Sequence, residues 1–438
     1  MVIFWSFIVN NNLKMITIVG AGLAGLSAAY HLNKEYTVLE RDSKVGGLCQ
    51  SINLDGYIFD YAPHILFTRN SYTKTLFHNL LGDNLHTQNR QAYIYMNDTY
   101  VKYPFEANLY PLPEDIKEEC IQGVIDKPTT EPTNFYEWIQ TTMGPGIARH
   151  YMVPYNEKIW KYPLNKMNTE WIKGRVPSPS VEDMRIGATS PQQMEYGPNA
   201  EFWYPQRGGI GALAEGLAEN IPVKLRTEAT WFTPTSNGVD TLYVEDFEEK
   251  TIHSEKVVSS LPLPEVINMM DGVPDEVQKA ANNLVYNSLV CVMLGVKRPN
   301  ITDKHWLYFP EPDLIFNRIS FPMNFSKYTT PEGCSSILVE VTYRDKEMNL
   351  EDTKGKVLED LASTNLITES DEITVCEALD FKYAYVIYDL NHNKNVKVIN
   401  DYLVAHNIIP IGRYGEWEYY NMDKAILSGK QAAETLNQ

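Results

Sequence analysis

The sequence predicts an α/β protein built around a dinucleotide-binding βαβ unit near the N-terminus, and three observations support this prediction. The 438 residues exceed the usual size of one domain, so two or three domains are expected. Residues 16–19 form a β-branched run typical of a buried parallel strand, and a small-residue helix over 24–33 and a second strand over 36–40 follow. Helix-period segments then occupy 113–173, and a strand-rich stretch covers 288–388. No low-complexity linker separates these regions, which indicates domains that are interleaved along the chain.

The composition is that of a globular protein with an acidic surface. Hydrophobic residues make up 44% and charged residues 21%, and 38 Lys and Arg against 56 Asp and Glu give a net charge of −18. This balance argues against nucleic-acid binding, which needs a basic surface. The five cysteines are scattered without a CxxC motif, a pattern that favours a reducing compartment over a disulfide framework or a zinc site. The apolar stretch 1–10 is too short to span a bilayer and lacks the basic flank of a signal peptide. We therefore expect a cytoplasmic protein with no stable membrane insertion, no metal ion and no nucleic-acid partner.

A glycine motif, GAGLAG over residues 20–25, lies between the first strand and the helix. Gly20 permits a tight turn, Gly22 lets a pyrophosphate approach the backbone, and Gly25 lets the helix pack closely on the strand. Glu40 ends the second strand, where an acid accepts a ribose hydroxyl and disfavours a 2′-phosphate. Glycine turns of this pattern also occur by chance. The strand, the helix, the second strand and the terminal acid together nevertheless indicate a dinucleotide site.

The loop after the second strand carries an R-x4-GG pattern, formed by Arg41 and the pair Gly46-Gly47. Enzymes that bind nicotinamide dinucleotides usually lack this loop. It resembles the corresponding loop of a large flavoprotein group that contains amine oxidases, protoporphyrinogen oxidases and nucleotide-sugar mutases. The resemblance implies that the dinucleotide is FAD.

Further motifs in the rest of the chain resemble those of one family within that group. They are Tyr61-Ala62-Pro63-His64-Ile65, Tyr103-Pro104-Phe105 on an expected strand, the segments 154–160, 171–176, 196–199 and 205–209, Tyr308 with Arg318 ten residues later, and Gly412-Arg413-Tyr414-Gly415 with Tyr419 six residues after its arginine. In this order they are similar to the motifs of the UDP-galactopyranose mutases, above all the larger, fungal-type members. On these motifs the chain is identified as a member of that family from about residue 16 to the C-terminus.

The resemblance implies a Rossmann-like FAD-binding domain with an inserted helical domain and an antiparallel β-sheet domain. The FAD-binding domain would comprise residues 15–80, 205–260 and 395–438. The helical domain would occupy 112–175, and the sheet domain, which binds the substrate, would comprise 85–111 and 262–394.

The resemblance also assigns site residues. Those expected to bind FAD are Gly20, Gly22, Ala24, Gly25, Glu40, Arg41, Gly46, Gly47, Leu48, His64, Arg413, Asn421 and Met422. Those expected to bind the nucleotide sugar are Tyr103, Phe105, Glu106, Tyr151, Asn156, Trp160, Asn199, Tyr308, Tyr385 and Tyr419. Catalytic roles fall to His64, Arg175 and Arg318. Tyr383 and Tyr388 compete with Tyr385 for its role.

The residue types suit this ligand. A pyrophosphate must be desolvated, and the planar fork of an arginine makes paired, charge-assisted hydrogen bonds to it. Asn156 and Trp160 are four residues apart and would present an amide and a ring from one helical face, although a core tryptophan beside a surface amide is equally consistent with the spacing. The resemblance implies a redox-neutral reaction, in which N5 of reduced FAD attacks the anomeric carbon and lets UDP-galactopyranose and UDP-galactofuranose interconvert. NAD(P)H or another reductant would keep the flavin reduced.

One residue departs from the family pattern. Fungal-type members carry Gln and then Asn after the Tyr-Pro-Phe strip, whereas this chain has Glu106 and Ala107. An amide both donates to and accepts from uracil, while an ionised carboxylate only accepts. Guanine, another base that offers more donors, or a Glu106 that faces solvent and contacts no base are therefore open alternatives to uracil. The sugar is also open.

Other functions share the expected fold, because a fold does not fix a function. An oxidoreductase of the amine-oxidase or protoporphyrinogen-oxidase type would need an apolar substrate cavity. A mutase could act on another nucleotide-linked pyranose, and a non-catalytic relative could bind nucleotide sugars without isomerising them.

Overall fold

The computed structural model describes residues 15–172, 180–191 and 200–438. The chain divides into two units, each assembled from segments far apart in the sequence. The first comprises the described residues up to Gly47 together with Leu217–Asn282 and Val396–Gln438. The second comprises Leu48–Gly216 and Asn283–Asn395. The apolar stretch at residues 1–10 lies outside the described residues.

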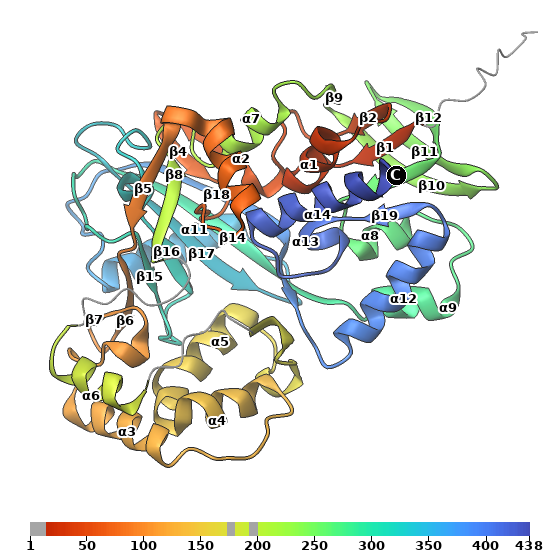
Figure 1. Cartoon of the computed structure of the whole chain (residues 1–438). Helices are drawn as coiled ribbons and strands as arrows, with labels where there is room; N and C mark the ends of the chain where they lie inside the picture. The colour runs from red at the N-terminus through yellow and green to blue at the C-terminus, as the bar shows by residue number, and fades with distance from the viewer. Residues whose placement is uncertain (1–14, 173–179, 192–199) are drawn as a thin grey trace, which may run out of the picture. The chain divides into compact units, whose positions relative to one another are not determined.

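The first unit is built on a parallel five-stranded sheet in the order β19-β13-β1-β2-β9 (Figure 1). Its strands are β1 (Ile16–Val19), β2 (Tyr36–Leu39), β9 (Val223–Lys224), β13 (Lys256–Ser259) and β19 (Ile408–Pro410). All four residues of β1 are buried, and β1 pairs in parallel with β13 on one side and β2 on the other. A strand covered on both faces selects a continuous apolar run, which explains the β-branched sequence of β1.

Helices and a small antiparallel sheet complete the first unit. The helices are α1 (Leu23–His31), α8 (Leu263–Asn268), α9 (Asp275–Asn282), α13 (Gly412–Gly415) and α14 (Met422–Leu436), with α12 (His392–Ala405) crossing the boundary between the units. The antiparallel sheet contains β10 (Thr227–Thr235), β11 (Gly238–Glu245) and β12 (Glu248–Ser254). Figure 1 shows α1 beside α14. These helices can approach closely because Gly429 has no side chain. A Cβ at this position would lie only 2.1 Å from the carbonyl oxygen of Ala24.

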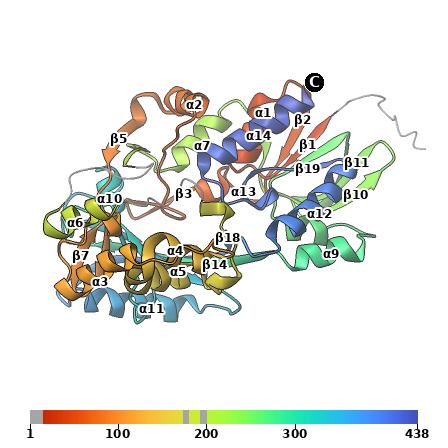
Figure 2. The same cartoon turned by 60° about the horizontal axis from the view of Figure 1, so that its bottom comes forward.

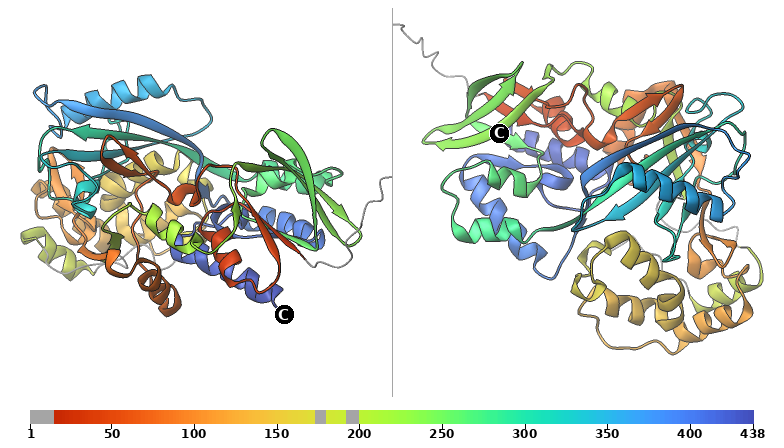
Figure 3. Two further views of the ribbon diagram at one scale, coloured as in Figure 1. Left: turned by 90° about the horizontal axis from the view of Figure 1, so that it is seen from above. Right: turned by 180° about the vertical axis from the view of Figure 1, so that it is seen from behind.

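The second unit contains a seven-stranded sheet in the order β18-β14-β17-β16-β15-β6-β7. Its strands are β6 (Ala92–Met96), β7 (Thr99–Lys102), β14 (Val285–Val296), β15 (Trp306–Tyr308), β16 (Arg318–Ser320), β17 (Ser335–Tyr343) and β18 (Ile373–Ile387). Every neighbouring pair is antiparallel except β15 with β6. Helix α11 (Leu350–Ser363) covers one face, as the view from behind shows (Figure 3), and Val357 and Leu361 belong to the same core as Val290 and Val339.

Helices form a separate group within the second unit (Figure 2). They are α3 (Glu114–Ile125), α4 (Phe135–Ile147), α5 (Val153–Trp160) and α6 (Val181–Thr189), and a π-helical turn over Ala148–Met152 joins α4 to α5. A Cβ on Gly146 would lie 2.3 Å from the carbonyl oxygen of Glu119, so glycine lets α4 approach α3. The remaining elements are α2 (Ser71–Leu81), α7 (Gly211–Ala218), which extends into the first unit, α10 (Pro322–Phe325), β3 (Ser51–Leu54), β4 (Tyr57–Asp60), β5 (Leu85–Asn89) and β8 (Glu201–Pro205).

One local prediction was wrong. The Tyr103-Pro104-Phe105 strip does not lie on a strand, because β7 ends at Lys102 and Phe105–Ala107 form a 3₁₀ helix. Pro104 has no N–H to donate to a sheet ladder, which accounts for the end of the strand. The C-terminal glycine motif over 412–415 forms the short helix α13. In the described ranges no helix is both long and apolar enough to cross a membrane, and no three His, Cys, Asp or Glu side chains are grouped to hold a metal ion.

Candidate functional site

The glycine turn after β1 has a backbone conformation and a close contact that require glycine. Gly20 has a φ of 92°, in the region that favours glycine. A Cβ on Gly25 would lie 1.9 Å from the carbonyl oxygen of Gly20, so α1 packs directly on the end of β1. This is the geometry that the GAGLAG pattern predicts.

The N-terminus of α1 has no side-chain cap. Its N-cap residue is Gly22, and no side chain caps the first turn, which leaves backbone N–H groups that can bind a phosphate. The R-x4-GG loop lies against this turn, because the N–H of Gly46 donates to the carbonyl oxygen of Ala21 over 2.8 Å and Gly46 forms a β-bridge with Gly22. Gly47 has a φ of 56°. The structure thus brings together the predicted cofactor residues of both motifs.

Glu40 completes this arrangement at the end of β2. Its carboxylate accepts hydrogen bonds from the N–H groups of Ala21, over 2.6 Å, and Asp42, over 2.8 Å. Burial raises the pKa of Glu40, although these hydrogen bonds oppose the shift. Each carboxylate oxygen can accept a second hydrogen bond, so a ribose hydroxyl fits here. Arg41 is exposed and lies 3.9 Å from the carboxylate of Asp42. The backbone N–H groups at the start of α1 and the Glu40 carboxylate therefore fit the pyrophosphate and a ribose of a dinucleotide.

The C-terminal motif of the first unit surrounds a second helix N-terminus. Arg413 donates from Nη1 to the carbonyl oxygen of Tyr420 over 3.1 Å, and its guanidinium lies 4.8 Å from the ring centre of Tyr419. Asn421 is the N-cap of α14 without a side-chain hydrogen bond to that helix, and Met422 is the first residue of the helix. Tyr419 thus belongs to the first unit.

The other predicted substrate residues that the structure describes belong to the second unit. At their centre is a row of side chains across three strands. Tyr308 on β15 lies opposite Arg318 on β16, which in turn lies opposite Glu340 on β17. The carboxylate of Glu340 accepts hydrogen bonds from Nε of Arg318 and, over 2.8 Å, from Nη2. Burial lowers the pKa of Arg318, but the adjacent carboxylate outweighs it and raises this pKa above its ordinary value. Arg318 is therefore a fixed cation.

Tyr385 on β18 extends this row. Its hydroxyl lies 3.5 Å from Nη2 of Arg318, and its ring centre lies 5.9 Å from that of Trp160. Tyr383 packs instead on Tyr286, with ring centres 4.5 Å apart, and Tyr388 stacks on a histidine, His392. Of the three competing tyrosines, the structure thus brings only Tyr385 to the arginine.

Asn156 and Trp160 share one face of α5, as their spacing predicts. Both are buried, and Nε1 of Trp160 donates to Oδ1 of Asn156 over 3.0 Å. Nδ2 of Asn156 donates to the carbonyl oxygen of Met152 over 2.7 Å. This pair orients the indole ring beside Tyr385.

A row of aromatic rings connects this region to Glu106. Tyr308 has its ring centre 5.5 Å from that of Tyr103 and 5.4 Å from that of Tyr155; Tyr155 stacks on Tyr151, and Tyr151 stacks on Phe105. Burial raises the pKa of both Tyr151 and Tyr155, so these phenols stay neutral donors.

Glu106 is an unusual buried acid. Its side chain is 4% exposed, and Oε1 has no hydrogen-bond partner among the described residues. Burial raises the pKa of Glu106 to about 7. The expected alternative of a solvent-facing Glu106 is therefore wrong for the described structure. A buried acceptor without a partner is costly, which makes it a candidate contact for a ligand.

His64 lies in the loop after β4, and Nδ1 is 2.7 Å from the carbonyl oxygen of Ala62. Asp60, at the end of β4, fixes the start of this loop, because it accepts hydrogen bonds from Ser51, Tyr204 and the N–H of Ile210. Leu48 lies in a 3₁₀ helix over Gly47–Cys49. The predicted residues Arg175 and Asn199 lie outside the described residues.

Two residues of the second unit were given no role by the sequence analysis. Glu340 was not assigned because only strand register brings it to Arg318. Tyr155 was not assigned, although it stands next to Asn156 and four residues after Tyr151, a spacing that places two tyrosines on one helical face.

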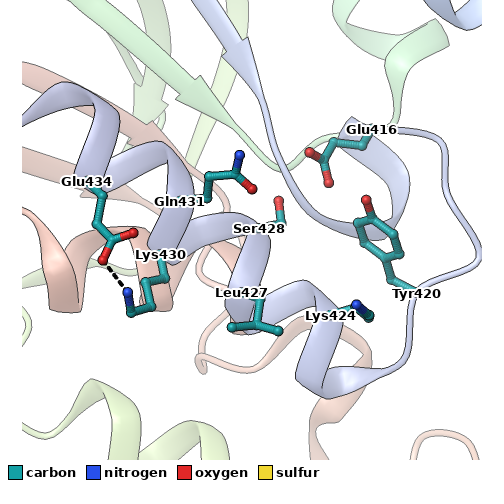
Figure 4. Close-up of a pocket in the computed structure, with 8 residues that line it drawn as sticks. All are labelled: Glu416, Tyr420, Lys424, Leu427, Ser428, Lys430, Gln431 and Glu434. Atoms are coloured by element: carbon teal, nitrogen blue, oxygen red, sulfur yellow. Dashed lines mark hydrogen bonds and ion pairs between the residues drawn. The ribbon is translucent and has the colours of Figure 1, made fainter. Parts of the chain in front are cut away.

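A cavity of about 560 Å³ on the first unit contains no predicted site residue (Figure 4). Its lining comes from α14 and the segment before it, and Figure 4 shows Glu416 and Tyr420 facing one another at one end. The charges of Lys430 and Glu434 pair with one another at the other end. We therefore assign neither flavin nor substrate to this cavity.

Known proteins that are similar to this chain include a flavin-containing family. The model of the family "flavin containing amine oxidoreductase" matches residues 23–437. A solved structure of a reduced UDP-galactopyranose mutase is similar with a TM-score of 0.90 and 26% identity, covering 97% of this chain and 93% of that chain. A protein provisionally named protoporphyrinogen oxidase, from Exiguobacterium sp. 255-15, has a TM-score of 0.76 and 16% identity, covering 97% of this chain and 99% of that chain.

Curated sequences extend the comparison. Coproporphyrinogen III oxidase of Bacillus subtilis (strain 168) is 19% identical over 433 residues, which are 90% of this chain and 91% of that protein. The matches confirm the predicted α/β flavoprotein fold and the likeness to the mutases, and they identify the cofactor as FAD.

Proposed function

Because this chain belongs to the flavin-containing amine oxidoreductase family, whose members are FAD-dependent enzymes, we propose that it is a flavin-dependent mutase of nucleotide sugars. Its reaction would interconvert the pyranose and furanose forms of the sugar, with UDP-galactopyranose and UDP-galactofuranose as the first pair to test. The proposal rests on one observation above the others: a fixed arginine with neutral phenols around it in the second unit. The main alternative function, oxidation of an apolar substrate, would need an apolar cavity instead.

Arg318 would bind the pyrophosphate of the nucleotide sugar. Nε and Nη2 of its guanidinium face Glu340, and Nη1 makes no hydrogen bond among the described residues. Nη1 can therefore donate to a phosphate oxygen, and the phenols of Tyr308 and Tyr385 beside Arg318 would add donors. Charge-assisted bonds of this kind would stabilise the diphosphate when its bond to the sugar breaks and hold it ready to return.

Glu106 and the aromatic rings around it would bind the base. A neutral Glu106 offers one donor and one acceptor, the same pattern as the amide of a glutamine, so uracil stays compatible with this chain. Trp160 would pack against the sugar from the face that it shares with Asn156.

The residues of the first unit would hold FAD. Gly22 and its neighbours at the start of α1 would bind the pyrophosphate of the cofactor, and Glu40 would accept a hydrogen bond from its ribose. When reduced, FAD supplies a nucleophilic nitrogen, N5, for the anomeric carbon. His64, Arg175 and Arg413 are proposed to contact the cofactor or the reacting sugar, and NAD(P)H or another reductant is proposed to reduce the flavin.

The test is isomerisation by the reduced holoprotein. The purified yellow protein is reduced with dithionite under anaerobic conditions, mixed with UDP-galactofuranose and analysed for UDP-galactopyranose by chromatography. We expect conversion in the reduced state and none in the oxidised state. Oxygen consumption without isomerisation would favour the oxidase, and binding of a panel of nucleotide sugars without any conversion would favour the non-catalytic alternative.

A further inference from the structure

Glu340 is a fully buried carboxylate that the proposed chemistry does not itself require. It lies in the middle of β17, is 0% exposed, and faces Arg318 on β16 and Cys291 on β14 across the sheet. Both of its oxygens accept hydrogen bonds from the guanidinium of Arg318. Arg318 thus already carries a bound counter-charge. Arg90 is a second arginine at the aromatic row, and its guanidinium lies 4.8 Å from the ring centre of Tyr103.

This pairing changes what Arg318 can offer to an anion. A bare guanidinium in a buried site attracts a diphosphate strongly, because the surroundings screen the charge poorly. A guanidinium with a carboxylate on two of its nitrogens attracts it much less, and the phenols of Tyr155, Tyr308 and Tyr385 add donors without adding charge. Binding that is equally tight before and after the bond-breaking step slows turnover, since the ligand must also be released.

We propose that Glu340 is a positioning residue that weakens the hold of Arg318 on the diphosphate as well as fixing its guanidinium plane. The role of Glu340 in turnover rests on the proposed function, whereas the effect of Glu340 on anion binding is independent of it. Glu340 would thus set a balance: Arg318 binds the diphosphate tightly enough to stabilise it as a leaving group and weakly enough to let the product go.

Anion binding to the oxidised holoprotein tests the inference without any isomerisation. Inorganic pyrophosphate and UDP are titrated by calorimetry into the wild type, Glu340→Gln and Glu340→Asp. Removing the negative charge should tighten pyrophosphate binding about tenfold in Glu340→Gln. Retracting the charge should tighten it about threefold in Glu340→Asp, because the shorter side chain compensates Arg318 less well.

A matched control separates the local effect from the net charge of the protein. Glu372 is an exposed carboxylate of the same unit that pairs with Lys297 over 2.9 Å, so Glu372→Gln changes the net charge equally. Its pyrophosphate affinity should equal that of the wild type. If Glu340 only supports the structure, both Glu340 variants should bind pyrophosphate more weakly or equally, and that result would overturn the inference.

Two further measurements keep the test decisive. If Glu340→Gln does not yield folded flavoprotein, Glu340→Asp alone decides: tighter pyrophosphate binding supports the inference, and equal or weaker binding refutes it. Where the reduced protein isomerises a nucleotide sugar, Glu340→Gln should lower KM and kcat together, whereas loss of support for Arg318 would raise KM. Tighter pyrophosphate binding without isomerisation in any variant would refute the proposed function and leave the inference on binding intact.

Discussion

The two candidate ligand regions of this protein are built in opposite ways. The glycine turn, the R-x4-GG loop and Glu40 come from one continuous stretch, residues 20–47, and make most of their hydrogen bonds to one another. The row around Arg318 combines strands and helices whose residues lie far apart in the sequence, from Tyr103 to Tyr385. The first region is therefore sensitive to backbone shape, and the second to the identity and charge of a few side chains.

The largest effect should come from adding a side chain to the glycine turn. In Gly25→Ala the new Cβ would lie 1.9 Å from the carbonyl oxygen of Gly20, so the start of α1 must move away from β1. We expect FAD affinity to fall by about hundredfold, because the phosphate site is formed by that helix start. The flavin absorbance of the purified protein measures the loss. Gly355→Ala, in a helix where a new Cβ meets nothing within 4 Å, should keep its full flavin content. Normal flavin content in Gly25→Ala would mean that FAD does not bind at this turn.

The next effect should come from the arginine of the second region. In Arg318→Ala we expect UDP affinity to fall by about thirtyfold with FAD still bound, since a buried, hydrogen-bonded cation is lost. Titration of UDP into the oxidised protein measures this change. Arg298→Ala, which removes an arginine paired with Asp371 over 2.8 Å, serves as the control and should bind UDP normally. Unchanged UDP affinity in Arg318→Ala would rule out the pyrophosphate assignment.

A smaller effect should appear as a pH dependence at Glu106. Burial raises the pKa of this carboxyl to about 7, so it is a neutral donor below that pH and an acceptor only above it. Uridine, which carries no titrating phosphate, should bind about tenfold more weakly at pH 8 than at pH 6. Glu106→Gln should bind uridine equally at both values, because its amide does not titrate. Glu106 would be excluded as the base contact if the wild-type affinity for uridine did not change with pH, or if Glu106→Gln kept the same pH dependence.

The smallest effect separates two neighbouring tyrosines of β18. The hydroxyl of Tyr385 approaches Arg318, whereas the ring of Tyr383 packs on Tyr286. Tyr385→Phe should weaken UDP binding about fivefold, the net contribution of one hydrogen bond, and Tyr383→Phe should leave it unchanged. Equal affinities in the two variants would remove Tyr385 from the proposed site.

The sequence by itself determined the βαβ unit at the start of the chain. Its two strands, the helix between them and the glycine turn at Gly20 all follow from short-range patterns, because glycines and apolar runs act over a few residues. The tertiary structure alone decided three other features: the pairing of Arg318 with Glu340, the choice of Tyr385 over Tyr383, and the burial of Glu106 without a partner. Each of these depends on strand register or on packing between distant segments. Such contacts leave no regular spacing in the sequence, so only the folded chain reveals them.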